Sequence, residues 1–62
     1  MLSDREREVL RLLAAGDSND EIARRLGLSI NTIERHVSNV YVKIDARGRA
    51  DATAWAIRNG VA

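Results

Sequence analysis

The chain contains no cysteine and no proline, and its 62 residues include a single histidine. Without cysteine there is no disulfide framework, and one histidine cannot build a Cys/His zinc site. No apolar run approaches the roughly 18 residues of a membrane span, and no signal peptide opens the sequence. We therefore expect a cytoplasmic domain that binds no metal, cofactor, membrane or small-molecule ligand.

The chain is also too short for a large core. At this length only about 60% of the unfolded surface is buried on folding, so we expect one domain, over residues 1–62, with a thin core. The net charge is only +1, but residues 1–23 carry −3 and residues 24–62 carry +4. A polyanionic partner would therefore meet the second part of the chain, although ordinary scatter of surface charge is an equally good interpretation.

Local signals predict helices throughout. Two Ser-x-x-Glu sequences, at residues 3–6 and 18–21, are typical capping boxes, and Ser29 opens a third segment. Apolar residues follow at helical spacing, while Gly16 and Gly27 suit the left-handed residue just past a helix end. No strand pattern or repeat is present. The sequence predicts an all-α fold of four helices, at about residues 4–14, 19–26, 30–44 and 49–59.

The connection between the second and third predicted helices is the most informative feature. Only residues 27–29 separate them, a length that suits the sharp bend of a helix-turn-helix. Ala23 allows the two helices to approach closely, Gly27 supplies a positive φ, and Leu28 and Ile33 fill the angle. Together these four residues predict a helix-turn-helix, with a helical bundle of the same bend and no DNA binding as the simpler alternative.

Further motif residues extend along nearly the whole chain. They are LSDREREVL at 2–10, SNDEIARRL at 18–26, Ser29 with Thr32-Ile33 and His36, Lys43-Ile44, and RADA at 49–52. This ordered set resembles the LuxR/FixJ/NarL-type (GerE-like) DNA-binding domain of bacterial transcription regulators. The resemblance implies a four-helix output domain whose third helix enters the major groove and whose fourth helix carries a dimer contact. RNA polymerase is a further candidate partner. In that family the domain usually follows a receiver or sensor domain, and none lies within these 62 residues.

The third predicted helix can be interpreted from its periodicity alone. At about 100° per residue its apolar positions form one inward stripe, and short polar side chains lie opposite. Arg35 can fork to guanine, Glu34 can accept from the cytosine amino group, and Ser38 can take either base or phosphate. We therefore predict that base contacts are made by Asn31, Glu34, Arg35 and Ser38.

Phosphate contacts are expected from exposed polar side chains and from free N–H groups at helix starts. The predicted residues are Ser18, Asn19, Ile30, Thr32, His36, Asn39 and Lys43. For His36 the resemblance implies packing together with an approach to the DNA backbone, whereas a half-buried, hydrogen-bonded histidine is the simpler interpretation. His36 and Ser38 are two residues apart on a helix and do not face each other, so they form no nucleophile–base pair. We expect no enzyme activity.

Three residues depart from the family pattern. Glu34 places a carboxylate where many relatives have a basic or neutral residue, Val42 replaces a position that is often basic, and Asp45 replaces a frequent helix-ending glycine. These departures put affinity and sequence preference in question more than the fold.

The fourth predicted helix has two apolar faces, and a helix on the outside of a monomer needs only one. One stripe holds Ala50, Ala54, Ile57 and Val61, and the other holds Ala52, Trp55 and Ala56. We therefore predict a homodimer, weak without DNA, on a two-half-site operator. The candidate contacts are Ala50, Ala54, Trp55 and Ile57, and the sequence does not say which stripe faces the partner.

Two other functions stay open. The promoter-recognition domain of a sigma factor shares the first three helices, but residues 47–52, which lead into a fourth helix, argue against it. A helical protein-interaction module that has lost DNA binding is compatible with Glu34 and the small net charge.

Overall fold

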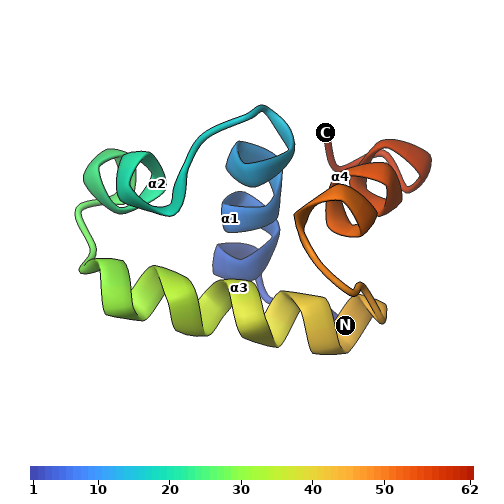
Figure 1. Ribbon diagram of the computed structural model, residues 1–62, viewed down its shortest axis with the longest axis horizontal. Coiled ribbons are helices and arrows are strands. Elements are labelled where there is room, and N and C mark those ends of the chain that lie inside the picture. The colour runs from blue at the N-terminus through green and yellow to red at the C-terminus, as the bar shows by residue number, and fades with distance from the viewer.

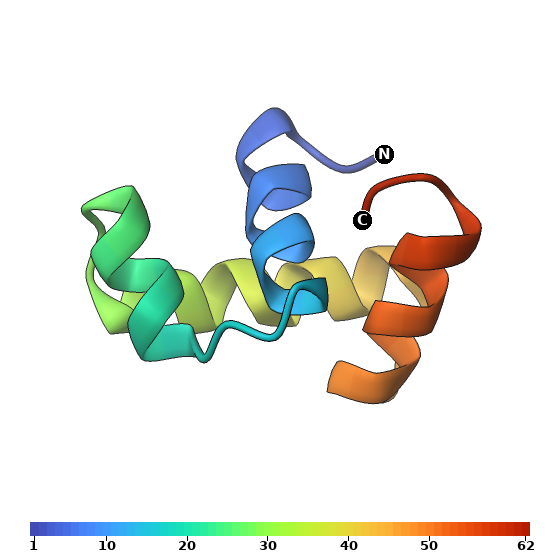
Figure 2. The same ribbon diagram turned by 90° about the horizontal axis from the view of Figure 1, so that it is seen from above.

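The computed structural model describes residues 1–62 and consists of four helices without a strand. They are α1 (Asp4–Ala14), α2 (Asn19–Leu26), α3 (Ile30–Ile44) and α4 (Arg49–Arg58). In Figure 1, α3 lies along the lower edge of the molecule, with α2 above its start and α4 above its end. Both views place α1 between α2 and α4 (Figures 1 and 2). The predicted all-α fold is confirmed, with α4 ending one residue earlier than expected.

Serine side chains fix the start of the first three helices. The Ser3 hydroxyl accepts from the Glu6 N–H at 3.1 Å, and the Glu6 carboxylate accepts from the Ser3 N–H at 2.8 Å. Ser18 and Glu21 repeat this capping box with the same two distances. The hydroxyl of Ser29 caps the start of α3. Each cap satisfies backbone groups that a helix start otherwise leaves free, which is why the sequence predicts these starts well.

Two residues with positive φ stop α2 and α3. Gly27 has φ +66°, as predicted, and the Leu28 N–H that follows donates to the Ala23 carbonyl at 3.0 Å. Asp45 ends α3 with φ +57°, the only non-glycine residue in this region. Aspartate tolerates this conformation better than most side chains do, so α3 can end here without glycine.

The core lies where α1 packs against each of the other three helices. Its apolar residues are Val9, Leu10, Leu13, Ile22, Ala23, Ile33, Val37, Val40, Ala52, Ala56 and Val61. None of the four helices combines the length and the apolar composition needed to cross a membrane.

Val61 does not continue the stripe of Ala50, Ala54 and Ile57, so the sequence prediction was wrong at this residue. Gly60 has φ +71° and turns the chain back beyond the end of α4. The Val61 N–H then donates to the Ala56 carbonyl at 2.8 Å, and the side chain is only 7% exposed. Helical periodicity could not predict this placement because the helix has already ended.

Candidate nucleic-acid interface

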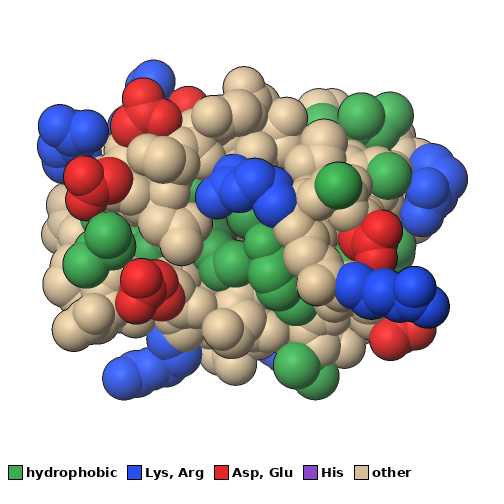
Figure 3. Space-filling model, in the orientation of Figure 1, with side chains coloured by type: hydrophobic (Ala, Val, Ile, Leu, Met, Phe, Trp, Pro, Cys, Tyr) green, Lys and Arg blue, Asp and Glu red, His purple; other side chains and the backbone are tan.

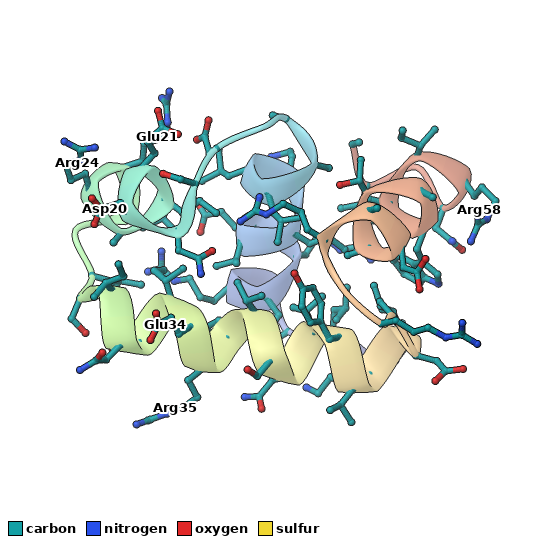
Figure 4. The ribbon with its side chains drawn as sticks, in the orientation of Figure 1. Asp20, Glu21, Arg24, Glu34, Arg35 and Arg58 are labelled. Carbon is teal, nitrogen blue, oxygen red and sulfur yellow. The ribbon has the colours of Figure 1, made fainter.

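The outer face of α3 is not covered by any other helix. Ile33, Val37 and Val40 point inward and are at most 7% exposed. The exposed residues along the helix are Ile30, Asn31, Glu34, Arg35, Ser38, Asn39, Val42 and Lys43. Figure 4 shows Arg35 projecting away from the other three helices. The four predicted base-contacting residues therefore all lie on exposed surface of one helix.

The bend between α2 and α3 holds this face in place. Ala23, at the close approach of the two helices, is 6% exposed, and Ile33 is fully buried. Leu28 is half-buried and packs against the core. These contacts fill the angle between the helices as the sequence predicts, and they leave the outer side of α3 free to enter a groove.

The start of α2 keeps two backbone N–H groups without a partner, and the start of α3 keeps three. The first turn of a helix always leaves such groups, and the serine caps satisfy only part of them. At α2 the unpaired groups belong to Asn19 and Asp20, and at α3 to Ser29, Ile30 and Asn31. N–H groups at a helix start favour an anion, so both starts suit phosphate oxygens.

Acidic side chains surround the start of α2. Figure 4 shows Asp20, Glu21 and Arg24 together on this helix. The N–H and hydroxyl of Ser18 lower the pKa of Glu21, so its carboxylate stays charged. On the face drawn in Figure 3, blue and red side chains are interspersed and form no single basic patch. This view shows the side of the domain, whereas Arg35 projects from its lower edge.

Lys43 has a partner that the sequence analysis missed. Its ammonium lies 2.8 Å from Glu6 Oε1, and Glu6 is only 5% exposed. The hydrogen bond from Lys43, followed by that from the Ser3 N–H, holds the pKa of Glu6 at about 2. The pair joins the last turn of α3 to the first turn of α1. Since an ammonium has three N–H donors and the Lys43 side chain is 41% exposed, donors remain for a phosphate.

Arg49 connects three elements and was also missed. Its guanidinium donates to the Asp17 carbonyl at 2.8 Å, to Asn19 Oδ1 at 3.1 Å and to the Leu13 carbonyl at 3.5 Å. The start of α4 is thus attached to the α1–α2 loop and to the start of α2. Because Oδ1 of Asn19 is occupied, its Nδ2 group is the donor left for a phosphate.

A second ion pair braces the same loop. Arg25 Nε lies 2.7 Å from Asp17 Oδ2, although this buried oxygen has no donor in hydrogen-bond geometry.

Partners 30 or more residues apart, such as those of Arg49 and Lys43, leave no local pattern, so no spacing in the sequence reveals them.

The remaining predicted residues lie at the surface. Ser18 and Asn39 are exposed, while Thr32 and His36 are half-buried. The chain contains no group of three or more His, Cys, Asp or Glu side chains that could hold a metal ion.

The structure separates the two faces of α4. Ala52 and Ala56 are fully buried, and Trp55 is half-buried against the core. Ile57 is 65% exposed, and Ala50 also faces solvent. Of the four predicted dimer contacts, Ala50 and Ile57 therefore lie on the outer side, whereas Ala54 and Trp55 are both half-buried.

Comparisons with known proteins agree with this geometry. Residues 1–56 match the family described as "Bacterial regulatory proteins, luxR family" (GerE). The chain is 44% identical over 59 residues to the CsgBAC operon transcriptional regulatory protein of Escherichia coli, covering 95% of this chain and 27% of that protein. It is 39% identical over 61 residues to the response regulator protein VraR of Staphylococcus aureus, covering 98% and 29%.

Two solved structures share the fold closely. "VqmA bound to DPO" superposes with a TM-score of 0.91 at 35% identity, covering 97% of this chain and 30% of that one. A complex of VqmA from Vibrio cholera with a ligand and DNA gives a TM-score of 0.89 at 34% identity, covering 98% and 27%. The chain thus spans less than a third of the length of each of these proteins.

Proposed function

This chain belongs to the luxR family of bacterial regulatory proteins and is a helix-turn-helix DNA-binding domain of a transcription regulator, and we propose that it places α3 in the major groove of double-stranded DNA. The observation that carries this proposal is the outer face of α3, which is exposed along its length and built of short polar side chains around Arg35. A helix of this kind fits the major groove, where each base pair presents a distinct pattern of donors and acceptors.

Base recognition is assigned to residues 31, 34, 35 and 38. Arg35 forks to O6 and N7 of a guanine, and Glu34 accepts a hydrogen bond from the amino group of a cytosine. Asn31 and Ser38 lie on the same exposed side and complete the contact. Arg35 makes the largest contribution to base discrimination in this proposal, because a bidentate pair discriminates most strongly between bases.

Phosphate contacts are assigned to the two helix starts and to the polar residues beside the reading face. Free N–H groups at the starts of α2 and α3, together with Asn19 Nδ2, bind one strand of the backbone. Lys43 contributes while keeping its bond to Glu6. The full proposed set is Ser18, Asn19, Ile30, Thr32, His36, Asn39 and Lys43.

We also propose that two copies bind a two-half-site operator. The exposed Ile57 and Ala50 leave an apolar outer face on α4, opposite the buried side that holds Ala52. Dimers of helix-turn-helix domains place their reading helices about one DNA turn apart, roughly 34–36 Å. The family resemblance adds RNA polymerase as a partner of the DNA-bound regulator and the cytoplasm as its location.

Selection of bound sequences from a random duplex pool tests the proposal. We expect enrichment of a pair of inverted half-sites, and the selected duplex should bind more tightly than random duplex at the same salt concentration. A pool without enrichment after several rounds would reject sequence-specific binding. Arg35→Ala should flatten the enriched motif, whereas Arg11→Ala, an exposed residue of α1, should leave it intact.

Retention on heparin and on random duplex DNA distinguishes the alternatives. A helical protein-interaction module would elute at low salt from both, because it has no phosphate contacts to release counterions. The matched family is a class of transcription regulators and not an enzyme class, and residues 47–52, which lead into α4, favour it over the sigma-factor alternative.

A further inference from the structure

Val42 is the apolar residue that α3 exposes most. It is 81% exposed, whereas Ile30, the other exposed apolar residue of this helix, is 42% exposed. Nothing within the domain accounts for a valine at this position. It buries little apolar area, and β-branched residues favour helices less than alanine, lysine or arginine do. A contact with an apolar group outside the domain is what this side chain can still contribute.

Val42 lies in line with the proposed base-contacting residues. At about 100° per residue, positions 31 and 38 lie within about 60° of Arg35 around the helix, and Val42 lies only about 20° from it. Ile30 is about 140° away on another side of the helix. Figure 4 shows Arg35 projecting away from the other three helices. Val42 therefore faces the same groove of the DNA as Arg35.

The helical turn that carries Val42 is anchored to the core. Tyr41 before it and Ile44 after it pack against core residues, and the Lys43 ammonium lies 2.8 Å from the carboxylate of Glu6 in α1. A valine in a helix also keeps mainly one χ1 rotamer. Since little conformational freedom remains to be lost on binding, even a small apolar contact adds affinity.

Only thymine offers an apolar group in the major groove of unmodified DNA. Its C5-methyl group lies there, whereas the edges of the other three bases present hydrogen-bond donors and acceptors. Valine has no polar atom in its side chain, so covering those groups would leave them without a partner, which is unfavourable. We propose that the isopropyl group of Val42 packs on the methyl group of a thymine and thereby selects for that base. This inference rests on the proposed function and adds one residue to its base contacts.

Helix geometry limits where this thymine lies. Val42 follows Arg35 by seven residues, roughly 10 Å along the helix axis. One turn of DNA, about 10–10.5 base pairs, is about 34–36 Å long, so this distance spans at most about three base pairs. We therefore expect the thymine within about three base pairs of the guanine that Arg35 binds, on the side of the last turn of α3.

Removal of the methyl group from the DNA tests the contact directly. Deoxyuridine pairs as thymidine does but lacks the C5-methyl group. Each thymine within three base pairs of the Arg35 guanine is replaced singly by deoxyuridine in a duplex with one selected half-site. At one of these positions the parent domain should lose about fourfold in affinity, the effect of burying about one methyl group.

Variants of Val42 show whether this loss depends on the valine. Val42→Ala should bind the thymine and uracil duplexes about equally, and its selected motif should lose the thymine preference at that position alone. Val42→Ile keeps an apolar, β-branched side chain and should keep the preference. Arg11→Ala, in the exposed part of α1, is the control and should respond to uracil as the parent does. Since Val42 is exposed and alanine favours helices more, Val42→Ala should melt no lower than the parent.

Several outcomes would overturn the contact. They are a selected half-site without a thymine in this range, a parent that binds the thymine and uracil duplexes equally, and a Val42→Ala variant that keeps the thymine preference. A variant that loses equal affinity on both duplexes while the parent does the same would show that Val42 supports binding without recognising the methyl group. A parent domain that selects no half-site rejects the proposed function instead, so the two failures are distinguishable.

Discussion

Aspartate substitutions at Ala56 and Ile57, which are neighbours on α4, separate the core face of this helix from its outer face. Ala56 is fully buried and Ile57 is 65% exposed. A carboxylate at position 56 would be buried without a partner, which costs several kcal/mol. Domains are stable by about 0.05–0.15 kcal/mol per residue, so roughly 3–9 kcal/mol is available here. Ala56→Asp should therefore unfold the domain.

Ile57→Asp should have a much smaller effect on the fold. About a third of the side chain is buried, and complete burial of an isoleucine contributes about 1.5–3 kcal/mol. The expected loss is therefore about 0.5–1 kcal/mol, which lowers the melting temperature by several degrees, at about 4–8 °C per kcal/mol for a domain of this size. Cooperative binding to two half-sites should be lost, because a charge enters the apolar contact twice.

Thermal melts followed by circular dichroism measure the change in stability. Titration of one-half-site and two-half-site duplexes measures the cooperativity of DNA binding. Ile57→Ala, which removes apolar area without adding charge, is the control and should weaken cooperativity only partly. A folded Ala56→Asp variant would refute the assignment of the core face. An Ile57→Asp variant that stays folded and binds cooperatively would show that α4 does not form the dimer contact.

Three further predictions concern α3 and the Lys43–Glu6 ion pair that joins it to α1. Arg35→Ala should cost about 1–3 kcal/mol on the selected site and relax preference at one base pair per half-site, measured against random duplex; equal losses on both duplexes would contradict base recognition. Glu34→Lys should raise non-specific affinity and steepen its salt dependence if Glu34 lies near phosphates, or lose preference at one position if it recognises cytosine; no change in either quantity removes Glu34 from the interface. Because folding lowers the pKa of Glu6 from 4.5 to about 2, the pair with Lys43 stabilises the fold fully above pH 4.5 and progressively less down to about pH 2. Lys43→Met should therefore move acid unfolding to higher pH, and an unchanged acid transition would show that the pair contributes nothing.

The helix positions could be predicted because their signals are local. Each of the serines at positions 3, 18 and 29 caps a helix start through atoms three residues away, so sequence spacing alone defines the contact. The turn at Gly27 is equally local, since its positive φ depends on one residue. The bend between α2 and α3 follows from these two signals, and it sets which side of α3 is exposed.

Contacts between distant residues could not be predicted in the same way. Glu6 was identified as a capping residue, and the structure adds Lys43, 37 positions later, as a second partner of the same carboxylate oxygen. No pattern in the sequence indicates that the Arg49 guanidinium donates to the carbonyls of Leu13 and Asp17, because only the tertiary fold brings these groups together. Periodicity likewise left open which apolar stripe of α4 faces outward, because both stripes are regular and only packing against α1 separates them.

The ion pairs and hydrogen bonds within the domain change the meaning of the charge distribution. Residues 24–62 carry +4 by sequence, but Lys43 and Arg25 are paired with acidic residues of the first part of the chain. Arg49 in turn directs its guanidinium to carbonyl and amide oxygens within the domain. The positive charge free to meet DNA is therefore smaller than the sequence indicates. Electrostatic attraction between basic side chains and phosphates does not depend on the DNA sequence. Because this attraction is weak here, the affinity for DNA depends more on base contacts and on the binding of the second copy. A single domain should consequently bind random DNA weakly, and recognition should require two correctly spaced half-sites.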